Sequence, residues 1–502
     1  MTQKQDSSHV ESFNEANINN SDAEKGVRVA SDKAEPEKPV HLKLDKSGFP
    51  MVPQPSDHKD DPLNWPIWAK VYIVLMVSGL GFINQMGSAL VNPTFVVMAK
   101  DFNVTVVQAS YCTTVYILLS GITPMFIVPF SNIYGRRILY LTFSLVGIAA
   151  QIGSGAAATY GGVITGRVFY GIGASIPIGI GAATGERGVY MGIYTLCVNN
   201  GPHIAPIIGG YIALNLSWRW CFYIPGIINA GLWVALLFTF PETLFSRDDF
   251  SNLEGTSYVS KLLFKGKVLN RPIRFWDFIT PYRMIGYWAV SLPSIYWMTA
   301  NTYGSALFAV TGSHLAAELY QFNVAQTGLL MGLPLTIGCM IGEATAGWVS
   351  DMLLNAYAKR HNGHRKPEAR LFLMPACLTL TVGVIVYGPC VQSHKPWIAL
   401  ALCMGVAGFG LQVGATMVYT YTTDCYKPQS AEIGAVINLY KSVFAFNIGF
   451  YAVPFGESAG WQVSFPVLGA INTVTLLPVI YLYFKGEKIR ERQGLPKIHE
   501  DL

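Results

Sequence analysis

Charged residues are scarce in this sequence of 502 residues. Asp, Glu, Lys and Arg together make up 13% of it, about half the share of roughly 25% that is usual in soluble globular proteins. The shortage is uneven, because residues 1–68 carry 12 acidic and 8 basic residues while the other 434 carry only 45. This composition excludes an ordinary soluble enzyme and indicates a polar tail attached to a lipid-embedded body.

Several motifs are missing as well. No long apolar run precedes residue 69, which excludes a cleavable secretory signal peptide in this sequence. The eight cysteines form no C-x-x-C pair and lie mostly in apolar runs, so they indicate neither a disulfide framework nor a metal site. There is no G-x-x-x-x-G-K-[ST] phosphate loop either. We therefore expect no cofactor, no metal and no nucleotide-driven step, and the basic residues line loops beside apolar runs rather than indicate nucleic acid.

Long apolar runs are abundant instead. A helix needs about 20 apolar residues to cross the hydrocarbon of a bilayer, and twelve such runs follow residue 68. Because lipid offers the backbone no hydrogen-bond partner, each run is expected to be helical. The predicted spans cover 69–91, 107–130, 137–156, 161–183, 189–214 and 219–241, then 284–310, 324–350, 370–392, 396–423, 430–455 and 461–484.

The runs fall into two sets of six, and similar punctuation after spans two and eight suggests an internal repeat. The predicted fold is an all-α membrane protein whose twelve transmembrane helices form two pseudo-symmetric six-helix bundles. The predicted parts are a disordered cytoplasmic tail over 1–68, a bundle over 69–241, a cytoplasmic central loop over 242–283, a bundle over 284–484 and a cytoplasmic tail over 485–502.

Lys and Arg are strongly biased to one side of this arrangement. If the N-terminus is cytoplasmic, 30 of them fall on the cytoplasmic side and 3 on the other. The positive-inside rule then predicts a multi-pass protein with both termini in the cytoplasm. The sequons at Asn103 and Asn215 lie in outward loops and are candidate glycosylation sites.

Arg167, Glu343 and Lys441 are charged residues placed well inside predicted spans, where charge is costly and usually functional. We interpret Arg167 as a gating residue, with a clamp on backbone carbonyls as the structural alternative. Glu343 is the one carboxylate placed well inside a span, which makes it the candidate proton carrier, with an internal ion pair as the alternative. The candidate substrate cavity, in which each residue has packing as its alternative, comprises Asn84, Gln85, His203, Tyr296, Asn301, Gln412, Asn438 and Lys441.

Gating and coupling are also predicted where helices bend or end. In span five, Pro202 and Pro206 each remove a helix hydrogen bond, and Gly209 with Gly210 lets another helix approach closely. An ordinary kink is the alternative. Arg136 and Arg137 follow span two, and Asp351 lies at the corresponding place after span eight. The two arginines can hold helix carbonyls and neighbouring carboxylates, and positive-inside topology is the alternative explanation for them.

Taken together, these motifs resemble the major facilitator superfamily, and specifically its twelve-span fungal drug:proton antiporter family, over about residues 60–490. The motifs are Asp61-Pro62-x-Asn64-Trp65, Gly135-Arg136-Arg137, Arg167-x-x-x-Gly171-x-Gly173, the Gly201 to Gly210 antiporter-type segment, Trp218-Arg219-Trp220, Pro241-Glu242-Thr243-Leu244 and Pro367-Glu368-x-Arg370-Leu371. Each is weak by itself, but their order and their positions at the spans make the resemblance specific.

The resemblance implies two bundles that rock about a central site and are driven by a proton gradient. The predicted function is secondary active, proton-coupled efflux of a small organic molecule, a drug or a fungal secondary metabolite, by a plasma-membrane monomer that is not an enzyme. The alternative is a proton-coupled importer of organic cations or polyamines, because the stretch from Thr423 to Tyr426 resembles that branch. A membrane enzyme is not favoured, because the sequence has no His-Asp or metal-type cluster at a span mouth. A receptor is not favoured either, because it would need a longer central loop.

The sequence departs from the family pattern at two places. Asn132 stands where the family usually has Asp, which predicts a weaker latch after span two. Only 18 residues separate Arg167 from Glu186, and Ala183-Thr184-Gly185 runs directly into Glu186-Arg187-Gly188. We expect either an unusually tight hairpin or a short exon piece lost from the gene model.

Overall fold

The computed structural model describes residues 56, 61–176, 187–244, 272–361, 366–426, 429–494 and 496, with the side chains of Leu63 and of 187–195 left aside. Within these ranges every regular element is a helix. Each of the twelve predicted spans overlaps at least one of them, so the all-α fold class is confirmed.

The first half begins with the short 3₁₀ helix η1 (Pro62–Asn64). Its helices are α2 (Ile67–Ala89), η2 (Asn92–Thr94), α3 (Phe95–Phe102), α4 (Val106–Tyr134), α5 (Arg136–Ala156), α6 (Tyr160–Gly173), α8 (Arg187–Asn215) and α9 (Trp220–Thr239). The segment 177–186, which holds most of the short connection noted above, lies outside the described residues. The prediction about that connection therefore stays a prediction.

The second half begins with α11 (Phe275–Arg283) and the 3₁₀ turn η4 (Met284–Gly286). It continues with α12 (Trp288–Asn301), the π-helical segment η5 (Thr302–Ala306), α13 (Leu307–Tyr320), α14 (Val324–Arg360), η6 (Pro367–Leu373), α15 (Met374–Gln392), α16 (Trp397–Cys425), α17 (Ser430–Ala459) and α18 (Trp461–Gln493). Helices α14 and α18 run past the predicted span ends, because charged residues end a hydropathic run without ending a helix.

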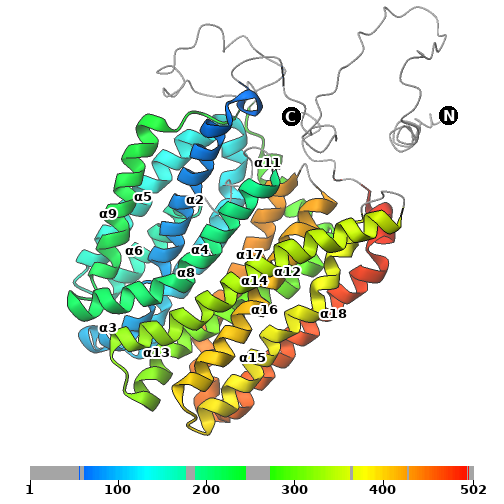
Figure 1. The fold of residues 1–502 in the computed structure, drawn as a ribbon. Coiled ribbons are helices and arrows are strands. Elements are labelled where there is room, and N and C mark those ends of the chain that lie inside the picture. The colour runs from blue at the N-terminus through cyan, green and yellow to red at the C-terminus, as the bar shows by residue number, and fades with distance from the viewer. Residues whose placement is uncertain are drawn as a thin grey trace, which may run out of the picture. The chain divides into compact units, whose positions relative to one another are not determined.

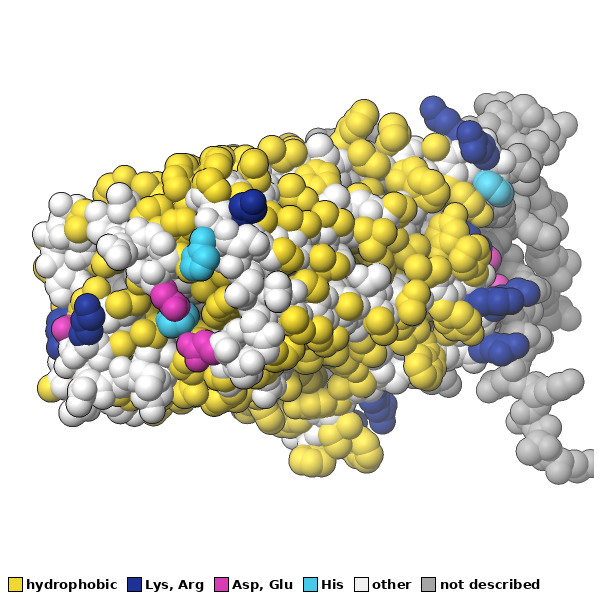
Figure 2. Space-filling view, turned by 90° about the horizontal axis from the view of Figure 1, so that it is seen from below, with side chains coloured by type: hydrophobic (Ala, Val, Ile, Leu, Met, Phe, Trp, Pro, Cys, Tyr) yellow, Lys and Arg dark blue, Asp and Glu magenta, His cyan; other side chains and the backbone are white. Residues whose placement is uncertain are grey.

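Nine stretches of the described chain are helical, long and apolar enough to cross a membrane. The three remaining predicted spans have visible reasons for falling short. Only 14 residues of α6 precede the undescribed segment, α8 carries polar residues and prolines in its middle, and the π-helical segment separates α12 from α13. Hydrophobic side chains dominate the face shown in Figure 2, on which charged side chains are sparse.

The two halves begin spans two and eight in the same way. Asn103 and Gln321 both have a left-handed φ of 52° and end the preceding helix. Two residues later a capping box starts the next helix: the Gln108 amide N donates to Thr105 Oγ1 at 3.1 Å in α4, and the Gln326 N donates to Asn323 Oδ1 at 2.9 Å in α14. This equal spacing supports the predicted internal repeat.

Helices of each half pack mainly on one another. In the first half α2 packs on α8 and α9, and α5 packs on α6 and α9; in the second, α16 packs on α14 and α15, and α18 on α12 and α15. The halves meet along two seams, where α8 packs on α14 and α4 on α17. Helices α3 and α13 lie at one end of the helices and α11 at the other (Figure 1), so we call these the α3 end and the α11 end.

Small residues line both seams. A Cβ placed on Gly328 of α14 would lie 2.2 Å from the Pro206 carbonyl oxygen of α8, and one on Gly121 of α4 would lie 2.2 Å from Ser442 Oγ of α17. No side chain larger than hydrogen fits at either position. At both positions the helices approach closely through small residues, and elsewhere on the α4–α17 seam the rings of Tyr111 and Phe450 pack with centroids 4.9 Å apart.

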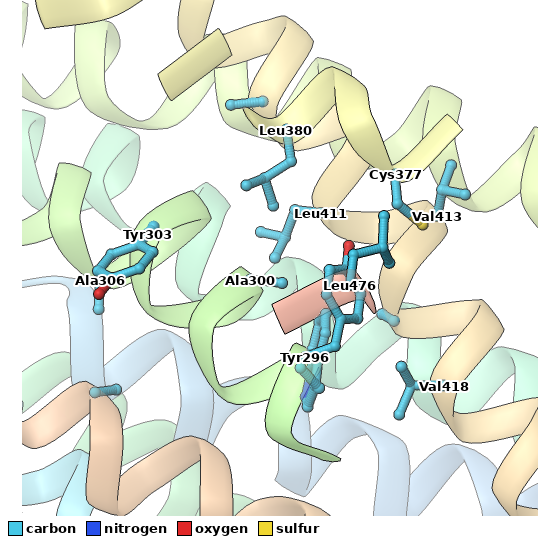
Figure 3. Close-up of a cluster of buried hydrophobic side chains, with 14 of the residues drawn as sticks. Tyr296, Ala300, Tyr303, Ala306, Cys377, Leu380, Leu411, Val413, Val418 and Leu476 are labelled. Carbon is cyan, nitrogen blue, oxygen red and sulfur yellow. The ribbon is translucent and has the colours of Figure 1, made fainter. Parts of the chain in front are cut away.

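A continuous apolar core fills the second half. Figure 3 shows part of it, around Tyr296, Leu380 and Leu411. Tyr296 is fully buried, and a Cβ on Gly414 of α16 would lie 2.9 Å from its hydroxyl oxygen. Tyr296, predicted to line the substrate cavity, therefore packs inside the second bundle.

Candidate transport and gating residues

The first half contains a buried polar cluster centred on Asn84 of α2. Asn229 Nδ2 of α9 donates to Asn84 Oδ1 at 2.9 Å, and the Tyr170 hydroxyl of α6 donates to the Asn84 carbonyl at 2.8 Å. The Tyr116 hydroxyl of α4 donates to Gln85 Oε1 at 2.9 Å. These bonds join the predicted residues Asn84 and Gln85 to α4, α6 and α9. Asn229 and Tyr170 were not predicted as site residues. Asn229 could have been recognised, because it is an amide side chain within the apolar span six.

Arg167 clamps the end of α2 from inside α6. Its side chain is fully buried. Nη1 donates to the Gly87 carbonyl at 3.0 Å and Nη2 to the Ser88 carbonyl at 3.4 Å. The guanidinium carbon lies 4.5 Å from the ring centroid of Phe222 in α9, a favourable cation–π distance. This geometry matches the carbonyl-clamp alternative and ties three helices together.

Glu343 lies between α14 and α16. Its Oε2 accepts hydrogen bonds from Gln412 Nε2 and, at 3.4 Å, from Thr416 Oγ1. The side chain is half-buried, and it forms no ion pair with any residue that the structure describes. Glu343 is therefore a carboxyl group held by neutral donors, and the predicted cavity residue Gln412 is one of them.

The other predicted cavity residues are distributed over α8, α12 and α17. Asn438 and Lys441 belong to α17, and a Cβ on Gly121 of α4 would lie 2.8 Å from the Asn438 carbonyl. Lys441 is half-buried and makes no ion pair in the described part of the chain. His203 of α8 is buried, and its carbonyl oxygen would lie 2.8 Å from a Cβ on Gly332 of α14. Asn301 ends α12 directly before the π-helical segment.

Gly209 and Gly210 hold α8 against two different helices. A Cβ on Gly209 would lie 1.9 Å from the Leu90 carbonyl oxygen that follows α2, and one on Gly210 would lie 2.7 Å from the Val324 carbonyl oxygen of α14. The predicted close approach is therefore present on both sides of the helix. The pair joins the packing of the first half to the seam.

Arg137 and Glu242 connect α5 with α9 at the α11 end. Arg137 Nη1 donates to the carbonyls of Leu236, at 3.1 Å, and Phe240, and Nη2 donates to Leu237 at 2.6 Å. Glu242 follows α9, and its carboxylate accepts from the backbone N of Arg136 at 2.8 Å and of Arg137 at 3.0 Å. Each residue satisfies backbone groups that a helix end leaves unpaired.

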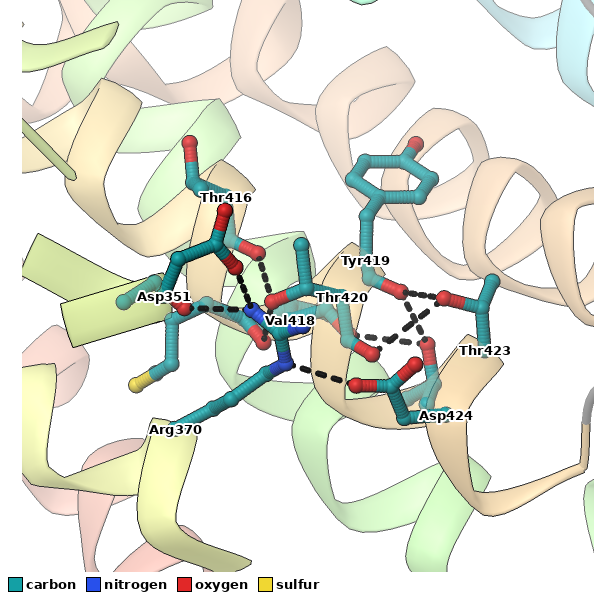
Figure 4. Close-up of polar contacts among 11 residues, drawn as sticks. Asp351, Arg370, Thr416, Val418, Tyr419, Thr420, Thr423 and Asp424 are labelled. Carbon is teal, nitrogen blue, oxygen red and sulfur yellow. Dashed lines mark hydrogen bonds and ion pairs between the residues drawn. The ribbon is translucent and has the colours of Figure 1, made fainter. Parts of the chain in front are cut away.

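The second half holds a corresponding charged cluster around Arg370 of η6, which Figure 4 shows. Arg370 Nε lies 2.6 Å from Asp424 Oδ2 of α16, and Nη1 lies 3.1 Å from Asp351 Oδ1 of α14. The neighbouring Glu368 is 2% exposed and receives Arg490 Nη2 of α18 at 2.7 Å. Asp351, predicted for gating, is thus one member of an ion-pair cluster that joins three helices.

A small pocket lies at the α11 end of the seam between α4 and α17. Its lining comprises Val128, Pro129 and Asn132 of α4, Asp277, Thr280 and Pro281 of α11, and Glu432 of α17. Asn132, the departure from the family pattern, therefore faces acidic side chains of the other half.

The sequons lie at exposed positions. Asn103 is exposed beyond α3, and Asn215 is exposed at the end of α8, where its Nδ2 donates to the Tyr211 carbonyl at 2.8 Å. Their glycosylation remains a prediction.

The π-helical segment η5 is a feature that the sequence reasoning missed. It interrupts span seven at Thr302–Ala306, and Tyr303 within it packs edge-on against Phe444 of α17, with ring centroids 6.0 Å apart. Single π turns inside helices frequently mark functional sites. The polar and glycine-bearing run from Asn301 to Ser305 was the available signal.

Comparison with known proteins decides the family. A model of the Major Facilitator Superfamily matches residues 77–452. The chain belongs to the major facilitator superfamily. It is accordingly a multi-pass membrane transporter rather than an enzyme.

Similar proteins of this superfamily are fungal. The chain is 29% identical to the MFS transporter cpaT of Aspergillus oryzae, over 86% of this chain and 89% of cpaT. It is 28% identical to the MFS-type transporter penM of Penicillium rubens, over 86% of this chain and 88% of penM. It is 25% identical to the efflux pump radE of Floropilus chiversii, over 86% of this chain and 83% of radE.

Proposed function

We propose that this superfamily member is a secondary active exporter that moves a small organic molecule, a drug or a fungal secondary metabolite, against its gradient in exchange for protons. The observation that carries the proton coupling is the environment of Glu343. A carboxyl group in a span, held by the neutral donors Gln412 and Thr416, can bind and release a proton without breaking an ion pair.

The seams support alternating access. Two bundles that approach closely at Gly121, Gly328 and other small residues can rock about these contacts. Clusters at the α11 end, around Arg137 in one half and Arg370 in the other, hold each half together as it moves. Both termini would then face the cytoplasm of a cell whose plasma membrane holds the protein.

Export is favoured over the import of organic cations or polyamines. The stretch from Thr423 to Tyr426, which suggested import, contains Asp424, and that carboxylate is already paired with Arg370 at 2.6 Å. A cation would have to compete with a guanidinium for it. In addition, one of the similar proteins, radE, carries the name efflux pump.

Transport in a yeast strain that lacks its own exporters tests the proposal. Cells that express this chain should retain less of a transported compound, and they should survive higher doses of it. An uncoupler that collapses the proton gradient should abolish both effects. Uncoupler-insensitive movement would contradict proton coupling, and accumulation instead of depletion would support import.

A further inference from the structure

Helix α11 turns an aromatic face outward. Phe275 is 76% exposed and Trp276 61% exposed. Tyr282 and Arg283 follow two helical turns later on the same face and are exposed as well. Surface aromatic side chains gathered in this way mark a surface that meets something other than water.

The opposite face of α11 is fixed against both halves. Phe278 packs edge-on against Phe130 of α4, with ring centroids 5.3 Å apart. Asp277 and Thr280 line the pocket that Glu432 of α17 also lines. Because α11 is anchored at the seam between α4 and α17, its aromatic face cannot turn inward.

The outward face is cationic as well as aromatic. Arg274 directly precedes the helix and is exposed. The guanidinium carbon of Arg283 lies 5.5 Å from the ring centroid of Trp276. The acidic residue of α11, Asp277, caps the helix start instead, since its Oδ2 accepts from the Arg274 backbone N at 2.9 Å. No carboxylate of α11 therefore opposes an anion on this face.

The level of α11 along the spans agrees with a lipid headgroup region. Trp288, the first residue of α12, follows the end of α11 closely and is 55% exposed. Trp68, near the start of α2, is 75% exposed. Tryptophan and tyrosine concentrate at the interface between membrane and water, and short helices with aromatic and basic residues on the lipid side lie in it.

We propose that the face formed by Arg274, Phe275, Trp276, Tyr282 and Arg283 is a binding surface for anionic phospholipid. The aromatic rings lie among the headgroups and upper acyl chains, and the two arginines pair with the phosphates and acidic headgroups. This surface is independent of the transported molecule. Helix α11 belongs to the connection between the halves and packs on both α4 and α17. The proposed lipid contact therefore lies on a helix that contacts both halves.

Fluorescence quenching by brominated lipids tests the surface. The full-length protein is reconstituted in vesicles of phosphatidylcholine that contain an equal fraction of brominated phosphatidylcholine or of brominated phosphatidylglycerol. The difference between wild type and Trp276→Phe isolates the signal of Trp276. We expect brominated phosphatidylglycerol to quench that signal about twofold or more beyond brominated phosphatidylcholine, because each arginine near the surface attracts acidic lipid.

Trp348 of α14 is the matched control, since it is 69% exposed on a span and none of the arginines that the structure describes lies over its ring. The signal isolated by Trp348→Phe should be quenched equally by the two lipids. In the Arg274→Gln, Arg283→Gln double variant, quenching of Trp276 should persist while its preference for phosphatidylglycerol is lost. Equal quenching of Trp276 in the wild type, no quenching because protein covers the face, or a preference that survives in the double variant would each overturn the proposal.

Discussion

Arg137 and Glu242 cap each other's helices. The guanidinium of Arg137, on the first turn of α5, binds three carbonyls at the end of α9, and the carboxylate of Glu242, just past α9, binds the first two backbone N–H groups of α5. Each charge has the sign that suits the helix dipole it meets. In the second half the signs are exchanged and the two side chains pair with each other: the acid Glu368 lies before α15 and the base Arg490 near the end of α18.

Gly135→Ala should destabilise the protein. Gly135 has a φ of 93°, and a Cβ there would lie 2.3 Å from Glu242 Oε2, so the change combines backbone strain with displacement of the capping carboxylate. We expect a loss of about 1–3 kcal/mol, seen as a lower midpoint of thermal unfolding in detergent. Gly153→Ala in α5, where nothing lies within 4 Å of the new Cβ, is the control. Equal midpoints for the two variants would contradict the capping role.

Gly328→Ala should loosen the α8–α14 seam and impair transport. Its Cβ would lie 2.2 Å from the Pro206 carbonyl, and backbone cannot move aside as a flexible side chain can. Gly347→Ala lies on the same helix with no atom within 4 Å, so it should keep transport and gain about 0.5–1 kcal/mol from helix propensity. Transport assays and unfolding midpoints on the two variants make the comparison. Normal transport by Gly328→Ala would argue against a seam that must stay closely packed.

The ion pair between Lys366 and Glu487 should stabilise the folded protein and lose this effect at high pH. A hydrogen bond from Lys366 Nζ to Glu487 Oε2, 2.6 Å long, raises the pKa of the lysine above its ordinary value of 10.5. A raised folded-state pKa means that the stabilisation is fully present below the unfolded pKa and is lost as the pH rises through the folded one. Both side chains are partly exposed, so the contribution is at most about 1 kcal/mol.

Lys366→Met should therefore lower the unfolding midpoint at pH 8 and make no difference once the pH exceeds the raised pKa of Lys366. Added salt should shrink the difference at pH 8. Lys359→Met removes an exposed lysine that pairs with no residue in the described part of α14 and its surroundings. A Lys366→Met effect that is constant with pH, or equal to that of Lys359→Met, would show that the ion pair contributes nothing.

Hydropathy predicted the positions of the helices well because the requirement that lipid imposes is local in sequence. The close packing at Gly209 and Gly210 in span five was predicted for the same reason, because paired glycines indicate a close helix contact without identifying the partner helix. The repeat could have been recognised further, because Asn103-x-Thr105 and Gln321-x-Asn323, each with Gln three residues on, are spaced alike.

Partners were harder to predict, because pairing depends on how distant segments meet. The sequence contains Arg137 and Glu242, but nothing in it states that they cap each other across 105 positions. Arg167 could be recognised as a buried charge, yet only its position beside Gly87 and Ser88 shows that it clamps carbonyls. The π turn at Thr302–Ala306 lies where Leu380 and Leu411 pack around Gly304, a distant contact that the polar run from Asn301 to Ser305 does not reveal.

Glu343→Gln tests the proton site with little structural cost. An amide oxygen can still accept from Gln412 and Thr416, so folding and substrate exchange should remain. Without an ionisable group, uphill transport and its pH dependence should disappear. A gradient of one pH unit supplies about 1.4 kcal/mol per proton, which is about a tenfold substrate gradient, and in reconstituted vesicles that gradient should collapse to equality for this variant.

Glu491→Gln is the control, because Glu491 is an exposed carboxylate near the end of α18. It should keep the full gradient, which separates loss of a particular proton site from loss of any one negative charge. Counterflow of labelled substrate, which needs no proton gradient, should be equal in both variants. If Glu343→Gln still builds a pH-dependent, uncoupler-sensitive gradient, the proton binds elsewhere and Glu343 serves only to join α14 to α16. If it loses counterflow as well, Glu343 acts in binding or rocking and the assignment of the proton to it fails.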